Sequence, residues 1–154
     1  MSIKEQNFAK AEMLIRKPVA DVFEAFVDPA TTTKVWFTKS TGRLDENDAV
    51  EWTWEMYGHT VPIRVKSIDK DLRIVIEWGN YGETTEVEWN FRSLDAGSTF
   101  VSVTNRGFVG NDEKIVSQIR DSTEGFTILL AGMKAYLEHS VELNLVGDRF
   151  PRSN

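Results

Sequence analysis

The sequence predicts an α+β fold in which an antiparallel sheet packs against one long helix near the C-terminus. Between residues 50 and 105, apolar and polar residues alternate, with turn-forming segments between the runs. This is typical of antiparallel strands with one buried face and one wet face. After residue 111 the apolar residues recur every three or four positions, the spacing of one helical face. We expect the 154 residues, 1–154, to form one domain.

A strand and two short helices are expected first. Residues 9–15 alternate, and Pro18 ends the strand because proline cannot donate to a ladder. Residues 19–27 have helical spacing and end at Asp28-Pro29. Residues 30–37 then predict a second short helix.

A meander of antiparallel strands follows, because short turns join the alternating runs. In this prediction the inward positions of the third run are Leu72, Ile74, Ile76 and Trp78. The predicted strands cover residues 50–56, 61–65, 72–78, 85–91 and 99–105, with turns at 57–59, 79–82 and 95–98.

The last third predicts a long helix, or two in line, over residues 112–140, with Asn111 or Asp112 as N-cap. Gly125 and Gly132 lie inside it, each at a cost of about 1 kcal/mol relative to alanine. They are seven residues apart and therefore share one side of the helix. Either the sheet approaches closely there, or space is kept for something else.

Composition excludes several classes of function. The chain has no cysteine, which removes disulfides and thiol chemistry and suits a reducing, cytoplasmic location. Its net charge of −6 lacks the basic footprint of a nucleic-acid-binding protein, so we expect no nucleic-acid partner. The apolar runs are too short for membrane insertion, and the first residues contain no apolar signal core.

Residues 44–95 contain five bases and twelve acids, a formal charge of −7. The alternation places several of these acids on the outer face of the sheet. That face is either simply solvated or a docking surface for a basic protein partner. The outer acids are Glu51, Glu55, Glu77, Glu86 and Glu88.

Catalytic and metal-binding patterns are missing from the sequence. The two histidines, His59 in a turn and His139 late in the long helix, have no partner at metal-ligand spacing. There is no phosphate-binding glycine loop and no nucleophile elbow. We therefore expect no metal, no cofactor and no assignable catalytic residue.

Aromatic residues are the unusual feature, with five tryptophans in 154 residues. Large rings between a curved sheet and a helix either fill the core or line an apolar cavity for a small molecule. We favour the cavity, with Thr85, Asn105 and Tyr136 as polar groups that orient a ligand. The predicted ligand-binding residues are Trp36, Trp52, Trp54, Trp78, Trp89, Phe91, Phe126, Leu130 and Met133.

Several segments, in this order, resemble the START/birch-pollen-allergen (SRPBCC) superfamily, and within it the branch named after the heat-shock chaperone ATPase activator. The first are residues 15–29 (IRKPVADVFEAFVDP) and Val35-Trp36. Gly97-Ser98-Thr99 matches the family's Gly-Gly-Thr turn. The helix pattern follows in Gly125-Phe126, Leu129, Leu130, Met133-Lys134 and Leu137-Glu138, with Phe126 in place of the usual tryptophan.

The resemblance implies a helix-grip fold, in which a seven-stranded antiparallel sheet curls around the last helix and encloses a cavity. Relatives bind lipids, sterols, hormones or polyketides there. Our first hypothesis is a non-catalytic cytoplasmic protein that binds a small apolar or aromatic molecule. The alternatives are a polyketide cyclase or aromatase-type enzyme, and a protein-interaction module related to chaperone ATPase activators.

Overall fold

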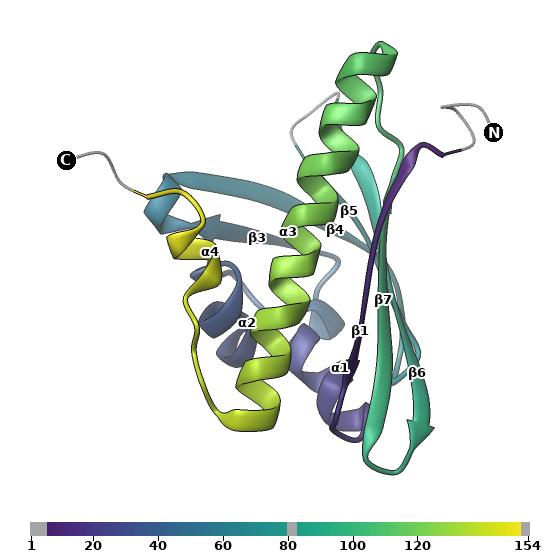
Figure 1. Ribbon diagram of the computed structural model, residues 1–154, viewed down its shortest axis with the longest axis vertical. Helices are drawn as coiled ribbons and strands as arrows, with labels where there is room; N and C mark the ends of the chain where they lie inside the picture. The colour runs from purple at the N-terminus through teal and green to yellow at the C-terminus, as the bar shows by residue number, and fades with distance from the viewer. Residues whose placement is uncertain (1–5, 80–82, 152–154) are drawn as a thin grey trace.

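The computed structural model describes residues 6–79 and 83–151. Seven antiparallel strands form one sheet in the order β1-β7-β6-β5-β4-β3-β2. The sheet curves around the long helix α3, which packs against β1, so the structure has the predicted α+β helix-grip architecture (Figure 1). The strands are β1 (Phe8–Ile15), β2 (Lys39–Ser40), β3 (Ala49–Trp54), β4 (His59–Asp69), β5 (Arg73–Trp78), β6 (Thr85–Asp95) and β7 (Ser98–Arg106).

The helices are α1 (Val19–Val27), α2 (Pro29–Val35), α3 (Asp112–His139) and α4 (Leu145–Asp148), with 3₁₀ turns η1 (Leu44–Glu46) and η2 (Glu55–Tyr57). α3 is one continuous helix, and Asn111 is its N-cap because its side chain accepts a hydrogen bond from the N–H of Lys114. The short helix α4 was not predicted. Figure 1 shows it beside the outer end of β3 and β4. No helix in the described part of the chain is both long and apolar enough to cross a membrane.

The prediction that the second helix extends through Trp36 and Phe37 is wrong. Asp28 caps α2 by accepting from the N–H of Ala30, and the helix ends at Val35. Beyond it, Trp36 adopts φ −141° and both rings turn into the core. Phe37 stacks on Trp52 with a centroid distance of 4.6 Å. Burial of two large rings therefore ends the helix earlier than its sequence pattern suggests.

Two details of the predicted meander are also wrong. The strand predicted to reach Met56 ends at Trp54, because the chain turns through η2 and reverses at Gly58, whose φ of +59° suits glycine. Leu72, predicted to face inward, lies in a turn and is 64% exposed. The turn predicted at 79–82 falls mostly on residues 80–82, which lie outside the described residues.

Lys134 and Glu138 tie α3 to the end of β1. The Lys134 ammonium donates to the backbone carbonyl of Leu14 and to Glu138, at 2.7 Å each. The same Glu138 carboxylate accepts from the backbone N–H of Arg16 at 2.8 Å. The Lys and Glu of the sequence pattern therefore fix one side of the helix to the sheet at the end of β1.

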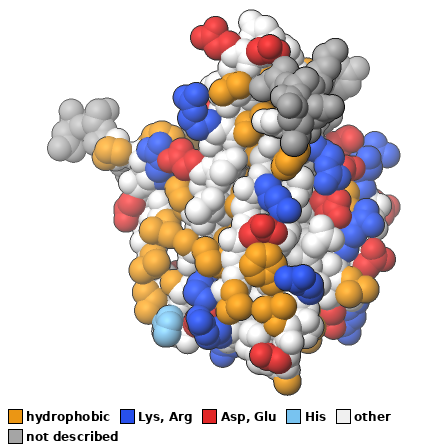
Figure 2. Space-filling view, turned by 45° about the vertical axis from the view of Figure 1, so that its right-hand side comes forward, with side chains coloured by type: hydrophobic (Ala, Val, Ile, Leu, Met, Phe, Trp, Pro, Cys, Tyr) orange, Lys and Arg blue, Asp and Glu red, His pale blue; other side chains and the backbone are white. Residues whose placement is uncertain are grey.

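The outer face of the sheet carries opposite charges in contact rather than acids alone. Lys66 lies within 4 Å of Glu77 and Glu86, and Arg106 lies 3.1–3.2 Å from Glu86 and Glu88. Figure 2 shows basic and acidic side chains interspersed on its right-hand side. Such pairs contribute little stability each, but they reduce the acidic field that a basic partner would meet.

Candidate ligand-binding groove

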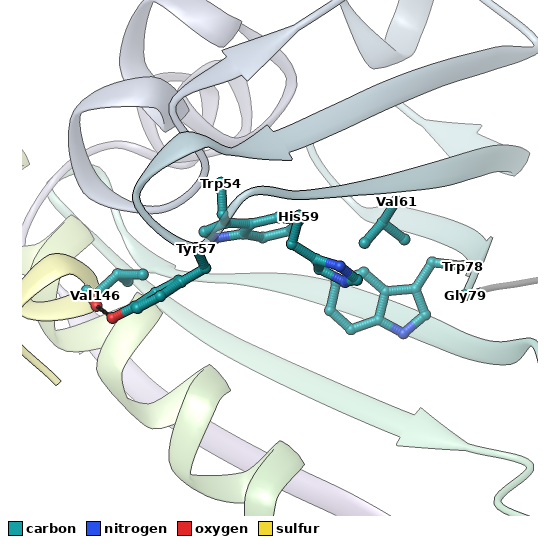
Figure 3. A pocket seen from close by; sticks show the side chains of 7 residues that line it. All are labelled: Trp54, Tyr57, His59, Val61, Trp78, Gly79 and Val146. Carbon is teal, nitrogen blue, oxygen red and sulfur yellow. Dashed lines mark hydrogen bonds between the residues drawn. The ribbon is translucent and has the colours of Figure 1, made fainter. Parts of the chain in front are cut away.

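An open apolar hollow of about 590 Å³ lies at the β3–β5 end of the sheet (Figure 3). Strand residues Trp54, His59, Val61 and Trp78 form most of its wall. In Figure 3 the rings of Trp54 and His59 lie close together, and Trp78 stands at the opposite end from Tyr57. The full lining is Trp54, Tyr57, His59, Val61, Trp78, Gly79 and Val146.

Two smaller hollows adjoin the first and extend it to α3. The first, of about 270 Å³, shares Trp78 with the large hollow. The second, of about 130 Å³, shares Tyr57 and Val146 with it. We call the three together the groove. The hollow of about 270 Å³ is lined by Trp36, Trp78, Asn105, Asp121, Ser122, Gly125 and Phe126. The hollow of about 130 Å³ is lined by Trp36, Tyr57, Gly125, Ile128, Val146, Arg149 and Phe150.

Strand pairing and glycine-containing turns place the residues that form the wall of the groove. Trp54 and His59 are cross-strand partners of β3 and β4, so the turn at Gly58 brings their rings within 6.4 Å. Trp78 ends β5 and is followed by Gly79 at φ +116°. A Cβ at Gly79 would stand 2.9 Å from the carbonyl oxygen of Glu83, so only glycine lets the chain leave the strand here.

Three rings form the floor of the groove. The centroids of Trp36, Trp78 and Phe126 lie 5.6–5.9 Å apart, which places one ring from each of three separate segments in mutual contact. Such distances are favourable for aromatic pairs. The floor is therefore apolar and well packed rather than open to the core beneath it.

The C-terminal segment closes one side of the groove. The Tyr57 hydroxyl donates a hydrogen bond to the backbone carbonyl of Val146, drawn as a dashed line in Figure 3. Arg149 forms an ion pair with Glu124 of α3, which lowers the pKa of that carboxyl. Phe150 meets Tyr57 edge to face. These contacts hold residues 145–150 against the groove.

A hydrogen-bonded chain of side chains connects the sheet to α3 at the end of the groove away from the C-terminal segment. The indole N–H of Trp78 donates to Thr85, its cross-strand partner, at 3.1 Å. The Asn105 amide donates to the Thr85 hydroxyl and to the Glu86 carbonyl, at 2.9 Å each. Ser122 of α3 donates to the Asn105 carbonyl oxygen at 2.9 Å. Asn105 is thus buried with both of its amide hydrogens used, which rigidifies this end of the groove.

The predicted ligand-binding residues fall into two groups. Trp36, Trp54, Trp78 and Phe126 line the groove. The other five lie in the core and are absent from the groove's lining: Trp52, Trp89, Phe91, Leu130 and Met133, each at most 4% exposed. The indole N–H of Trp89 has no hydrogen-bond partner within the described part of the chain.

Of the three polar groups expected to orient a ligand, the structure brings two together. Thr85 and Asn105 belong to the hydrogen-bonded chain, and Asn105 lines the groove. Tyr136 instead packs near Lys34, whose ammonium lies 5.3 Å from the ring centroid, and the hydrogen bond that this ammonium donates to the tyrosine raises the pKa of Lys34. His59 lines the groove, whereas His139 is exposed at the end of α3.

The two helix glycines have different surroundings. A Cβ on Gly125 would meet nothing within 4 Å, and this residue lines both smaller hollows. A Cβ on Gly132 would touch Val35 and Leu145 at 3.7–3.8 Å. Gly132 therefore allows α2 and α4 to approach α3, whereas Gly125 leaves space in the groove.

Carboxyls with shifted pKa values, which mark many catalytic clefts, lie outside the groove. The carboxyls whose pKa values are lowered, Asp45, Glu88, Asp95, Glu124 and Glu138, line none of the three hollows. Across residues 6–79 and 83–151, no three His, Asp or Glu side chains stand close enough to hold a metal ion.

Several groove residues were not predicted from the sequence. Tyr57, Val146 and Phe150 come from a turn and a C-terminal segment that have no periodic pattern. Ser122 and Asp121 lie on the polar side of the amphipathic helix, where solvent exposure is the ordinary expectation. The only available signal was Gly125, which marks the helix face that the groove uses.

The family model described as "Activator of Hsp90 ATPase homolog 1-like protein" matches residues 16–138. A comparison with curated proteins found no match.

Solved structures share the fold. A protein from Staphylococcus saprophyticus, SSP2350, is 28% identical, with a TM-score of 0.75 over 88% of this chain and 95% of that one. Aha1 from Colwellia psychrerythraea, solved as a dimer, is 12% identical, with a TM-score of 0.69 over 86% and 96%. The di-domain ARO/CYC protein BexL is 15% identical, with a TM-score of 0.71 over 85% of this chain but 46% of its own.

Proposed function

Because the chain belongs to the Activator of Hsp90 ATPase homolog 1-like family, a branch of a ligand-binding fold, we propose that it is a cytoplasmic protein that binds a small apolar or aromatic molecule in the groove. One observation carries the proposal. The groove is concave, its main hollow of about 590 Å³ has the size of a small-molecule site, and its walls are mostly aromatic with a few fixed polar groups.

The site of the proposal is narrower than the cavity expected from the sequence. The four groove aromatics among the predicted residues contact the ligand, while the five core residues support them from below. Three of the four groove aromatics form the ring floor, and Trp36 of this floor lies 5.0 Å from Trp52 and 6.1 Å from Trp89 of the core group, measured between ring centroids. We propose binding without chemistry, since the groove's rings offer shape and apolar surface rather than paired acids and bases.

His59 favours a second candidate, a cyclase or aromatase-type enzyme. Its imidazole lines the main hollow within reach of a bound molecule, where it could act as a general acid or base. One structural neighbour, BexL, is described as a di-domain ARO/CYC protein. If this candidate is correct, His59→Gln abolishes turnover while leaving binding intact.

A protein-interaction module is the third candidate and has less support. Affinity at a protein interface comes from buried aromatic and arginine anchors. On the outer sheet face, the acids Glu77, Glu86 and Glu88 contact Lys66, Arg73 and Arg106 instead of standing free for a basic partner.

The test is equilibrium dialysis with 2-naphthol, together with native mass spectrometry of the purified protein. We expect saturable binding by the wild type and at least a tenfold loss in Gly125→Leu, because the leucine fills the space beside Gly125. Thr127→Leu is the control, since it places the same leucine side chain on an exposed position of α3 outside the groove. Equal binding by wild type and Gly125→Leu, or no binding by either, would contradict the proposal.

A further inference from the structure

The hydrogen-bonded chain at the α3 end of the groove has a fixed direction. Trp78 Nε1 can only donate, and the Glu86 carbonyl can only accept. The Asn105 atom that faces Glu86 O must therefore be the amide nitrogen, which places Oδ1 toward Ser122. The Glu86 carbonyl thus fixes the orientation of the Asn105 amide.

That direction determines what Ser122 can offer a ligand. Its hydroxyl has one hydrogen, and this hydrogen is donated to Asn105 Oδ1. The Ser122 oxygen is then left with acceptor capacity only. Asn105 Oδ1 accepts this one bond and keeps a second lone pair, while both amide hydrogens are already used.

Asp121 is the third polar residue beside this end of the groove. It neighbours Ser122 on α3 and lines the same hollow of about 270 Å³. A carboxylate accepts hydrogen bonds and donates none. The polar atoms that Asn105, Asp121 and Ser122 present to this hollow are therefore all acceptors.

The donors of the groove lie elsewhere. Trp78 Nε1 is used by Thr85, and the Tyr57 hydroxyl by the Val146 carbonyl. Arg149, whose Nε is paired with Glu124, lines the hollow of about 130 Å³ and not the one beside Asn105. His59 stands on the wall of the large hollow, which does not include Asn105, Asp121 or Ser122. A ligand that reaches from the rings to the α3 end therefore meets apolar surface first and acceptors last.

We infer that the groove selects aromatic ligands that carry a hydrogen-bond donor, a hydroxyl or an N–H, directed at Ser122, Asn105 and Asp121. This inference rests on the proposed function. A donor group satisfies these acceptors when they lose water, whereas a ligand that offers only an acceptor or only hydrocarbon leaves them without a partner. Buried polar groups without partners oppose binding.

Three probes of the same ring system isolate this effect. 2-Naphthol donates and accepts, 2-methoxynaphthalene only accepts, and 2-ethylnaphthalene does neither. Equilibrium dialysis should give 2-naphthol the highest affinity, about 3- to 10-fold above 2-ethylnaphthalene, the range expected for one net hydrogen bond. 2-Methoxynaphthalene should bind no better than 2-ethylnaphthalene.

One substitution tests whether Asp121 contributes to the preference for ligands with a hydrogen-bond donor. Asp121→Asn keeps the size of the side chain but adds an N–H donor, so the advantage of 2-naphthol over 2-methoxynaphthalene should shrink at least twofold. Thr127→Ala, on an exposed position of α3 outside the groove, should leave the ratio unchanged. Equal or higher affinity for 2-methoxynaphthalene in the wild type would overturn the inference while leaving the groove as a binding site. Failure of all three probes to bind would instead contradict the proposed function.

Discussion

The hydroxyl of Tyr57 donates a hydrogen bond to the backbone carbonyl of Val146, 89 residues further along the chain. This bond joins the turn between β3 and β4 to the short helix α4, and both residues line the groove. The contact therefore attaches the C-terminal segment to the mouth of the proposed site.

Tyr57→Phe keeps the ring and removes only this hydrogen bond. We expect 2-naphthol to dissociate several times faster, because residues 145–150 are held less firmly over the groove. The free energy of unfolding should fall by about 1 kcal/mol or less, since Tyr57 is 41% exposed. Stopped-flow dissociation measures the rate. Tyr136→Phe is the control, and an identical rate in both variants would show that the bond does not restrain the segment.

Gly132→Leu should destabilise the protein. The added side chain meets the backbone of Val35 and the side chain of Leu145 where a Cβ is already in contact. Overpacking of this kind costs about 1–3 kcal/mol. Chemical denaturation of Gly132→Leu and Gly125→Leu measures the difference, and the second should be the more stable. Equal stability would mean that α2 and α4 do not pack on α3 as described.

Trp89 tests whether the core beneath the ring floor is filled. The side chain is 2% exposed and its indole N–H has no hydrogen-bond partner in the described residues. Trp89→Ala should cost about 3–5 kcal/mol in unfolding free energy. Trp89→Phe should cost clearly less, because it loses ring area but no hydrogen bond. Denaturant titration of both variants checks this, and a folded Trp89→Ala of native stability would contradict the packed core.

Glu138 makes the stability of the protein depend on acid pH. Burial raises the pKa of this carboxyl, but hydrogen bonds from the Arg16 backbone and from Lys134 outweigh it and hold the pKa below the ordinary 4.5. A lowered folded-state pKa gives stability that is present above pH 4.5 and is lost as the pH falls through the folded value. Glu138→Gln should cost about 1–3 kcal/mol at pH 7.

The difference between wild type and Glu138→Gln should shrink below pH 4.5, where the wild-type carboxylate takes up its proton. Denaturation at pH 7 and at pH 3.5 measures it. A difference that stays constant over this range would show that the charge of Glu138 does not hold α3 to β1.

Regular periodicity made most of the fold predictable. The alternation from residue 85 to 91 gives β6 its buried Val87, Trp89 and Phe91, and the helical spacing after Asn111 gives α3. The prediction was weaker where tertiary packing overrides local pattern. Trp36 follows a helical pattern in the sequence, yet its ring turns away from the helix and meets six other aromatic residues.

The site was harder to predict than the fold. Inward alternation identifies Trp54 and Trp78 as apolar but gives no sign that they border open space while Trp52 and Trp89 do not. That distinction depends on where α3 ends its contact with the sheet and on α4, whose four residues carry no periodic signal. A resemblance that covers most of the chain predicts the architecture, whereas the lining of the groove depends on these local details.

The most direct test of the groove uses the five tryptophan indole N–H signals in an NMR titration with 2-naphthol. We expect the signals of Trp36, Trp54 and Trp78 to shift most, because these side chains line the groove. The signals of the buried Trp52 and Trp89 should move little. Larger shifts at Trp52 and Trp89, or no shifts at all, would contradict a ligand site in the groove.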